Sequence, residues 1–219
     1  MFKDHALLNG MNLSGMNLSG ARLNHSELRG SDLRGTNLSR SYLNQSSLFD
    51  AKLAGANLRG VIMIEADLHG SDLSGADLRG ANMPICNLFG SNLTHANLTS
   101  AFLAGCYLTG SNMDGADLSS CFMDQSFANR STLIRTNLNG ASLGGVKMSD
   151  TNLSEACFIR AFMDRSTLRN SILFGANLTG ASLVGANLIN ATISNADLSG
   201  VDLTESRCSG ANFVGSRLV

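Results

Sequence analysis

The sequence predicts an all-β chain that winds into a single four-sided solenoid, with about 20 residues in each coil and about eleven coils. Two regularities support this fold. Positions whose numbers end in 3 or 8, from Leu8 to Leu218, form one unbroken series, and leucine fills 32 of the 43. The residue two places earlier is nearly always small. A period of five fits neither the 3.6-residue turn of a helix nor the two-residue alternation of a strand, so the chain must bend once every five residues.

Each five-residue unit is expected to form one short side followed by a corner. In the unit 36–40, Thr36 and Leu38 would point inward, Asn37 would point outward, and the last two residues would turn the chain. Glycine and asparagine are frequent at the corners, where they tolerate a positive φ. One unit cannot bury its own leucine, but stacked coils can place each leucine over the next.

The number of sides follows from residues that break the pattern. Apolar residues in the outward slot recur at spacings that are multiples of 20, and so do four of the six central methionines, at 63, 83, 123 and 163. A 20-residue coil contains four units of five. At roughly 4.8 Å between coils, the solenoid would be about 50 Å long.

The repeated unit A(D/N)LxG, as in GADLRGAN and GANLTGASL, resembles the pentapeptide-repeat family over essentially the whole chain. The resemblance implies a right-handed, four-sided parallel β-helix. Members include bacterial quinolone-resistance proteins that protect DNA gyrase by mimicking DNA, secreted effectors of pathogens and cyanobacterial proteins, so it implies a fold and not one activity. The loop and the C-terminal helical module of the gyrase-protecting members have no counterpart in this sequence.

The unbroken repeats indicate that residues 1–219 form one domain. The N-terminal stretch MFKDHALLNG lacks the apolar run of a signal peptide, and polar residues interrupt every candidate membrane span. We therefore expect a cytoplasmic protein, with a secreted effector as the alternative.

The sequence predicts no catalytic, cofactor-binding or metal-binding residues and no small-molecule substrate. His25, His69 and His95 fall on three different sides of the predicted coil. Cys86 and Cys106 occupy small inward slots one coil apart and are expected to be buried packing residues. A regular solenoid without inserted loops offers few concave sites for chemistry, so we expect a non-enzymatic protein.

The charge pattern argues against binding to nucleic acid or to a membrane surface. The net charge is −1, and the most acidic side, that of Met63, carries five acidic and two basic residues. DNA mimicry requires a coherent acidic face, so a topoisomerase-protecting protein is only the alternative function. A group of arginines is expected to lie on several corners, solvated and not acting as one site: Arg130, Arg135, Arg160, Arg165 and Arg169.

Apolar side chains in outward slots gather on one side and around one corner. Exposed apolar patches of this kind usually mark a partner surface, and we expect a scaffold or binding protein that contacts a protein partner there. A homodimer is the simplest case, through this lateral face or through the ends of the solenoid. The residues of the predicted interface are Tyr42, Ile62, Ile64, Phe102, Tyr107, Phe122, Phe127 and Phe162.

Two local expectations accompany this fold. Ala128 stands where neighbouring units have a large residue, and we expect Phe127 to compensate through a backbone shift or by covering the gap. Asn17, Asn37 and Asn57 are spaced by 20, and we expect the side chains of this column to hydrogen-bond to their neighbours in adjacent coils. The column continues with Asp77, Asn97, Asp117, Asn137 and Asn177.

Overall fold

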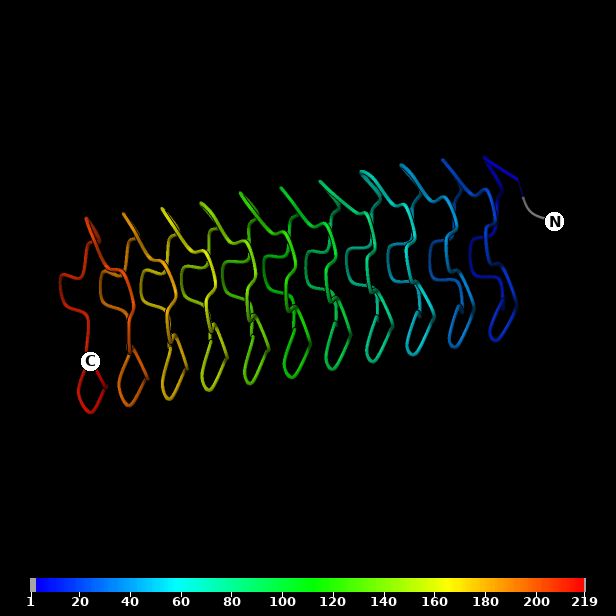
Figure 1. Ribbon diagram of the computed structural model, residues 1–219. Helices are drawn as coiled ribbons and strands as arrows, with labels where there is room; N and C mark the ends of the chain where they lie inside the picture. The colour runs from blue at the N-terminus through cyan, green and yellow to red at the C-terminus, as the bar shows by residue number, and fades with distance from the viewer. Residues whose placement is uncertain (1–2, 219) are drawn as a thin grey trace.

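The computed structural model describes residues 3–218 as one stack of similar coils, with the two ends of the chain at opposite ends of the stack (Figure 1). Within these residues there is no helix and no continuous strand. Single bridge residues occur at positions ending in 2 and 7, and two-residue turns follow at positions ending in 4–5 and 9–0. Each side of the coil is therefore one bridge residue long, and each corner is a turn.

Every bridge is parallel and joins residues whose numbers differ by 20, from Leu7 with Glu27 to Asp197 with Arg217. Between two bridged residues the chain passes through three further bridge positions, so each coil has four sides. The four-sided coil, predicted from the spacing of apolar residues, is confirmed by this register.

Backbone hydrogen bonds hold each coil to both of its neighbours. Tyr42 donates to the carbonyl of Ala21 in the preceding coil at 2.9 Å, and Leu43 donates to that of Ile62 in the following coil at 2.7 Å. The same pattern recurs along the chain, together with corner bonds to the next coil, as from Gln45 to Ile64, and turn bonds between consecutive units, as from Ser41 to Leu38. Adjacent coils are therefore locked in register.

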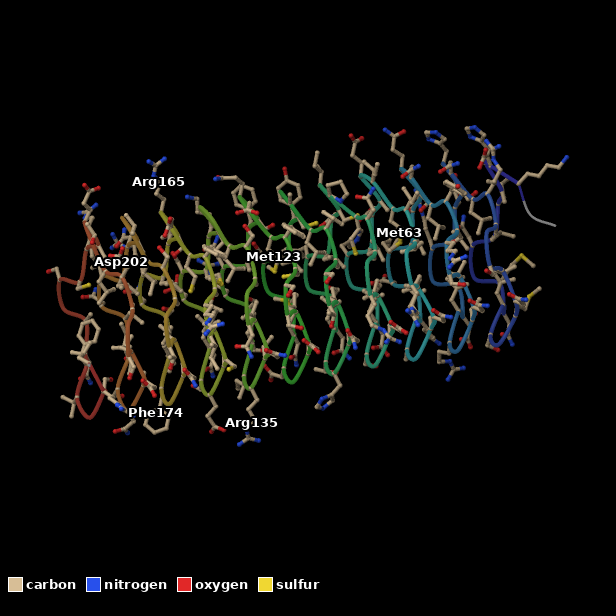
Figure 2. The ribbon with its side chains drawn as sticks, viewed as in Figure 1. Met63, Met123, Arg135, Arg165, Phe174 and Asp202 are labelled. Atoms are coloured by element: carbon tan, nitrogen blue, oxygen red, sulfur yellow. The ribbon has the colours of Figure 1, made fainter. Side chains whose placement is uncertain are left out.

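The interior is a continuous stack of the predicted inward residues. The central residues from Leu8 to Leu198 are at most 4% exposed, and Phe158 is the largest fully buried side chain. Met63 and Met123 lie inside the coils, whereas Arg135 and Arg165 project away from them (Figure 2). One large and one small inward residue per unit thus fill the core.

The corners impose a left-handed backbone on every fifth residue, whatever its type. Glycines take this role at many corners, as at Gly105 with φ +68°. Polar residues adopt it as well, and so does the β-branched Ile85, with φ +59°. The inter-coil hydrogen bonds, not local preference alone, therefore set the corner geometry.

The predicted asparagine column is confirmed for Asn17, Asn37 and Asn57, but it is wrong for Asn97 and Asn177, whose side chains hydrogen-bond within their own coils to Thr99 and Thr179. The Asn37 amide donates to Asn17 Oδ1 and the Asn57 amide donates to Asn37 Oδ1, each at 3.1 Å. Farther along, Asn137 donates to Asp117 at 3.0 Å. These side chains form a hydrogen-bonded ladder parallel to the solenoid axis.

The expected backbone shift at Ala128 is wrong. Phe127 makes ordinary bridges to Tyr107 and Lys147, and Ala128 is fully buried in a regular unit. The ring of Phe127 is turned outward onto Tyr107. The register of the neighbouring coils fixes this unit, and Ala128 is accommodated within it.

The first and last coils differ in how far their inward residues are covered. Leu8, Leu13 and Leu18 are at most 4% exposed, whereas Leu218 is 63% exposed and Leu203 is partly buried. No helix among the described residues is long and apolar enough to cross a membrane.

Candidate functional site

Four aromatic rings gather where two sides of the solenoid meet, and we call them the aromatic corner: Phe102, Tyr107, Phe122 and Phe127. Their outward slots bridge coil to coil, which places the rings in two short stacks. Phe102 and Phe122 have ring centroids 4.8 Å apart and planes 5° apart, and Tyr107 and Phe127 lie 5.4 Å apart at 6°. All four are 39–48% exposed. The stacks therefore form an ordered apolar surface open to solvent.

Ile85 extends this surface along the corner itself. It precedes Gly105 in the corner column, and its Cγ1 atom lies 3.7 Å from the position that a Gly105 Cβ would occupy. Its side chain is 50% exposed although its φ is +59°. A β-branched residue in this conformation costs of order 1–3 kcal/mol. The fold thus holds an apolar side chain outward where glycine or asparagine would be less strained.

The other residues of the predicted interface are less closely grouped. Tyr42 and Ile62 bridge to each other, but Asn82 separates them from Phe102. Tyr42 is exposed and Ile62 is half-buried. The sequence-predicted apolar side is therefore not one continuous strip at this end.

The remaining two predicted residues also stand apart. Phe162 is 60% exposed and is separated from Phe122 by Ser142. Ile64 is half-buried, and its backbone N–H donates to Asn44 Oδ1 at 2.9 Å. Only four of the eight predicted residues thus form the compact aromatic corner.

A shallow groove of about 600 Å³ lies beside the aromatic corner, and the sequence analysis missed it. Glu65 and Ile85 line one wall and Phe89 lines the other, with Asp67 between the walls and Tyr107 also in the lining. The Asp67 carboxylate accepts hydrogen bonds from Asn87 at 3.0 Å and contacts His69 Nδ1 at 2.7 Å. The groove therefore combines apolar walls with carboxylates.

A second aromatic column borders this groove and was also missed. Phe49 and His69 stack with centroids 4.7 Å apart, and the Arg29 guanidinium carbon lies 5.3 Å from the Phe49 ring centroid. Phe89 follows in the same column. The sequence carries a signal for this column, because Phe49, His69 and Phe89 are spaced by 20 and each directly follows a central leucine.

A smaller hollow of about 370 Å³ occurs on the corner column at Gly144 and Gly145. Asp124 accepts hydrogen bonds from the Gly144 N–H and from Ser142 Oγ, each at 2.8 Å. A Cβ at Gly144 would lie 2.8 Å from this carboxylate oxygen, so a side chain there would displace the Asp124 carboxylate. Arg165 lines the far end of the hollow.

Many charged groups are satisfied locally. The Arg34 guanidinium hydrogen-bonds Asp32, with Arg34 Nε 2.8 Å from Asp32 Oδ1, and lowers the pKa of that carboxyl to about 2. Arg79 lowers the pKa of Asp77 in the same way. The predicted placement of arginines on several corners is confirmed for four of them, because each has a positive φ at a different corner: Arg130, Arg135, Arg160 and Arg165.

The cysteines resemble packing residues. All five are free, and the Cys86 thiol donates to the Met63 carbonyl at 2.7 Å. Its hydrogen bond with Cys106, together with burial, raises the pKa of Cys86, and burial raises that of Cys121. No group of three or more His, Cys, Asp or Glu side chains within residues 3–218 could hold a metal ion.

The repeat geometry has a counterpart in a known sequence family. The profile described as pentapeptide repeats matches in eight copies, at residues 4–40, 46–83, 86–125, 131–170, 171–207 and 181–218. The chain belongs to the pentapeptide repeat family. Membership implies the right-handed quadrilateral β-helix, in keeping with the four-sided register. No curated protein matches the chain.

Several solved structures of pentapeptide repeat proteins are similar to this family member. HetL of the cyanobacterium Nostoc, involved in regulation of heterocyst differentiation, is 31% identical; the match covers 97% of this chain and 89% of HetL, with a TM-score of 0.36. A protein from the thylakoid lumen of Arabidopsis thaliana is 37% identical over 52% of this chain and 69% of its own, with a TM-score of 0.27. Full-length QnrB1, a plasmid-mediated fluoroquinolone resistance protein, is 19% identical over 98% and 92%, with a TM-score of 0.40.

Proposed function

We propose that this pentapeptide repeat protein is a non-enzymatic binding or scaffold protein that contacts a protein partner through the aromatic corner. Its fold is then a right-handed solenoid of about eleven coils that acts as a rigid support. The observation that carries the proposal is the pair of parallel ring stacks on two adjoining sides, with each ring 39–48% exposed. Aromatic residues are enriched at interface hot spots because they bury much area and lose little side-chain entropy.

The strained corner supports the same role. Ile85 keeps an exposed apolar side chain in a conformation that disfavours β-branched residues. Packing within the chain explains this choice poorly, since half of the Ile85 side chain is exposed and all other corners carry glycine or polar residues. A partner that covers Ile85 together with the rings would explain it.

A second copy of the chain is the simplest partner. Burying one large aromatic side chain contributes roughly 1.5–3 kcal/mol, so several such anchors can offset the entropy lost on association. The most common assembly of this kind is a two-fold dimer in which the same patch is used by both subunits.

The alternative, protection of a topoisomerase by DNA mimicry, draws no support from the charges. That role needs a continuous acidic face, and here Asp32 and Asp77 are each neutralised by a neighbouring arginine. The aromatic corner has no part in such mimicry.

Sedimentation velocity over a concentration series tests the proposal. The wild-type chain should form a dimer, and changing Phe102 and Phe122 together to Asn should yield a monomer with an unchanged circular dichroism spectrum. Asn occupies the same slot at Asn82, so the backbone accepts it. The matched control changes Ile172 and Phe174, which are 42% and 45% exposed, and should remain a dimer. A wild-type chain that stays monomeric at high micromolar concentration would overturn the homodimer.

A further inference from the structure

The aromatic corner has a centre, midway between the coil of Phe102 and the coil of Phe122. Suppose that a second copy packs against this centre with its solenoid axis antiparallel to that of the first. The two copies are then related by a two-fold axis that lies in the contact plane, perpendicular to the solenoid axis. A residue that lies a given number of coils before the centre then faces the residue of the same column that lies equally far after it. Because every column advances by one coil at each bridge, the facing residues can be read directly from the bridges. Phe102 would face Phe122 of the second copy, and Tyr107 would face Phe127.

The outward column that contains Phe102 and Phe122 has the same order of polar and apolar residues in both directions from this centre. On one half Phe102 is followed outward by Asn82 and Ile62, and on the other half Phe122 is followed by Ser142 and Phe162. In the antiparallel arrangement Asn82 faces Ser142, and Ile62 faces Phe162. Polar residues thus meet polar residues and apolar residues meet apolar residues, as a specific interface requires. The interruptions that divide the predicted apolar side become part of a self-complementary pattern.

The corner column is complementary in size and in charge. All of its residues have a positive φ, so they project from equivalent positions. Ile85 faces Gly145, and Gly105 faces Gln125, so each large side chain opposes a glycine. The outermost pair brings together an acid and a base, Glu65 and Arg165. The column, in chain order, is Glu65, Ile85, Gly105, Gln125, Gly145 and Arg165.

The projection at Ile85 has a matching hollow. Ile85 is 50% exposed, and the hollow of about 370 Å³ at Gly144 and Gly145 lies at the facing position. Gly145 itself is buried beneath the exposed side chain of Gln125, so this flexible side chain must move aside when a partner side chain enters. The hollow lies where Gly144 carries no side chain, between Asp124 and Asp164, which occupy the same slot in the adjacent coils.

The two charged residues are available for a partner. Both are exposed, and neither forms an ion pair with another residue in the described part of the chain. Glu65 only accepts a hydrogen bond from the Gln45 amide, at 2.8 Å. A parallel dimer would place Glu65 against Glu65 and Ile85 against Ile85, so charge and size both favour the antiparallel arrangement.

We propose that the chain forms an antiparallel two-fold dimer centred on the aromatic corner, in which Arg165 of each copy pairs with Glu65 of the other and Ile85 enters the hollow at Gly144 and Gly145. The proposal rests on the proposed function, since it assigns the partner and the register of the same face. The symmetry makes two copies of each contact.

Charge reversal tests the register. Glu65→Arg and Arg165→Glu should each weaken the dimer about ten-fold, because two exposed ion pairs become two repulsive pairs. The double variant Glu65→Arg/Arg165→Glu should recover affinity to within about three-fold of wild type, since both pairs are restored with opposite polarity. Glu205→Arg is the matched control on the same corner column and should leave the affinity unchanged.

Cysteine cross-linking separates the two dimer directions. In a parent that carries Cys157→Ser and Cys208→Ser, the double variant Ile62→Cys/Phe162→Cys should form a disulfide-linked dimer under mild oxidation. These outward slots accept cysteine, as Cys157 shows. Ile85→Cys alone should stay uncross-linked in the antiparallel dimer, whereas a parallel dimer about the corner column would bring this residue against itself.

The outcomes distinguish this inference from the proposed function. Cross-linking of the single variant, or failure of the double charge reversal to restore affinity, would overturn the register. If Phe102→Asn/Phe122→Asn still produces a monomer in that case, the aromatic corner remains the contact face. If the wild-type chain is a monomer, both the homodimer and this register are wrong.

Discussion

The rings of Phe102 and Phe122 lie parallel, with centroids 4.8 Å apart and planes 5° apart, although a full coil of the chain separates them. The spacing of adjacent coils produces this stack directly, because identical outward slots lie above one another. The same rule generates the asparagine ladder from amides. In this solenoid, therefore, the choice of residue in one slot of consecutive coils determines which chemistry a column presents to solvent.

The buried and exposed phenylalanines should differ sharply in their effect on stability. Phe158 is fully buried and Phe174 is 45% exposed, on an outer corner (Figure 2). Phe158→Ala should lower the free energy of unfolding by about 3–5 kcal/mol, because it leaves a cavity in the stacked core. Phe174→Ala should change it by less than about 0.5 kcal/mol. Urea denaturation followed by circular dichroism measures both, and equal losses would contradict the assignment of the core.

Ile85 should trade stability for association. Ile85→Asn relieves the strain of a β-branched residue at φ +59°, so the free energy of unfolding should rise by about 1 kcal/mol. The same change should weaken the dimer, since the projecting side chain is lost. Thermal denaturation and sedimentation velocity measure the two effects. A large loss of stability would mean that Ile85 serves packing within the chain.

Gly55→Ala measures the cost of placing a side chain at a corner with a positive φ, the strain that Ile85→Asn is expected to relieve. Gly55 has φ +64°, and no heavy atom lies within 4 Å of its Cβ position, so only the backbone conformation opposes a side chain. We expect a cost of about 1–2 kcal/mol. A neutral result would show that the corners tolerate L-residues without strain and would remove the basis of the Ile85 prediction.

The asparagine ladder should stabilise the coils that it joins. The Asn37 side chain donates to Asn17 and accepts from Asn57 and from the Ser39 N–H, so Asn37→Val breaks three hydrogen bonds. We expect a loss of about 1–3 kcal/mol, because net hydrogen bonds contribute about 1 kcal/mol each. Native-state amide hydrogen exchange should show faster opening of the coils around this residue. Exchange that is faster only at distant coils would contradict the ladder's local role.

The Asp32–Arg34 pair predicts a pH dependence. Hydrogen bonding from Arg34 holds the pKa of Asp32 at about 2, below the ordinary 3.8. The carboxylate therefore stabilises the folded chain at pH values above about 3.8, and this contribution is lost as the pH falls through about 2. A carbon-13 NMR titration should find this low pKa, and Arg34→Gln should raise it toward 3.8. Arg59→Gln is the control and should leave the titration of Asp32 unchanged.

Most of the fold could be predicted from the sequence, because every five-residue unit forms the same side and corner and every coil stacks in the same register. Tyr42, Ile62 and Phe102 revealed the length of the coil, since apolar residues in one column share a side only at that spacing. The positive φ of Ile85 could not be inferred from its type, because hydrogen bonds between coils impose it. The backbone shift expected at Ala128 is absent for a related reason: the neighbouring coils hold the backbone of this unit, so one small side chain does not bend it.

The candidate site was only partly visible in the sequence. The four rings of the aromatic corner were found because they occupy slots that are usually polar. Phe49 and Phe89 were missed because they follow the central residue of their units, and only the apolar residues that precede a central residue were compared between coils. The proposed pairing of Ile85 with Gly145, and of Glu65 with Arg165, rests on the exposure of these corner residues and on the hollow at Gly144, which the sequence does not reveal.

Hydroxyl-radical footprinting with mass spectrometry, performed at a low and a high protein concentration, reports directly on whether the aromatic corner is buried in the dimer. Oxidation of Phe102, Tyr107, Phe122 and Phe127 should fall at the high concentration, where the dimer forms, while oxidation of Phe174 should stay the same. Equal oxidation of the four rings at both concentrations, in a chain that sedimentation shows to be dimeric at the higher one, would contradict the claim that the aromatic corner is the contact face.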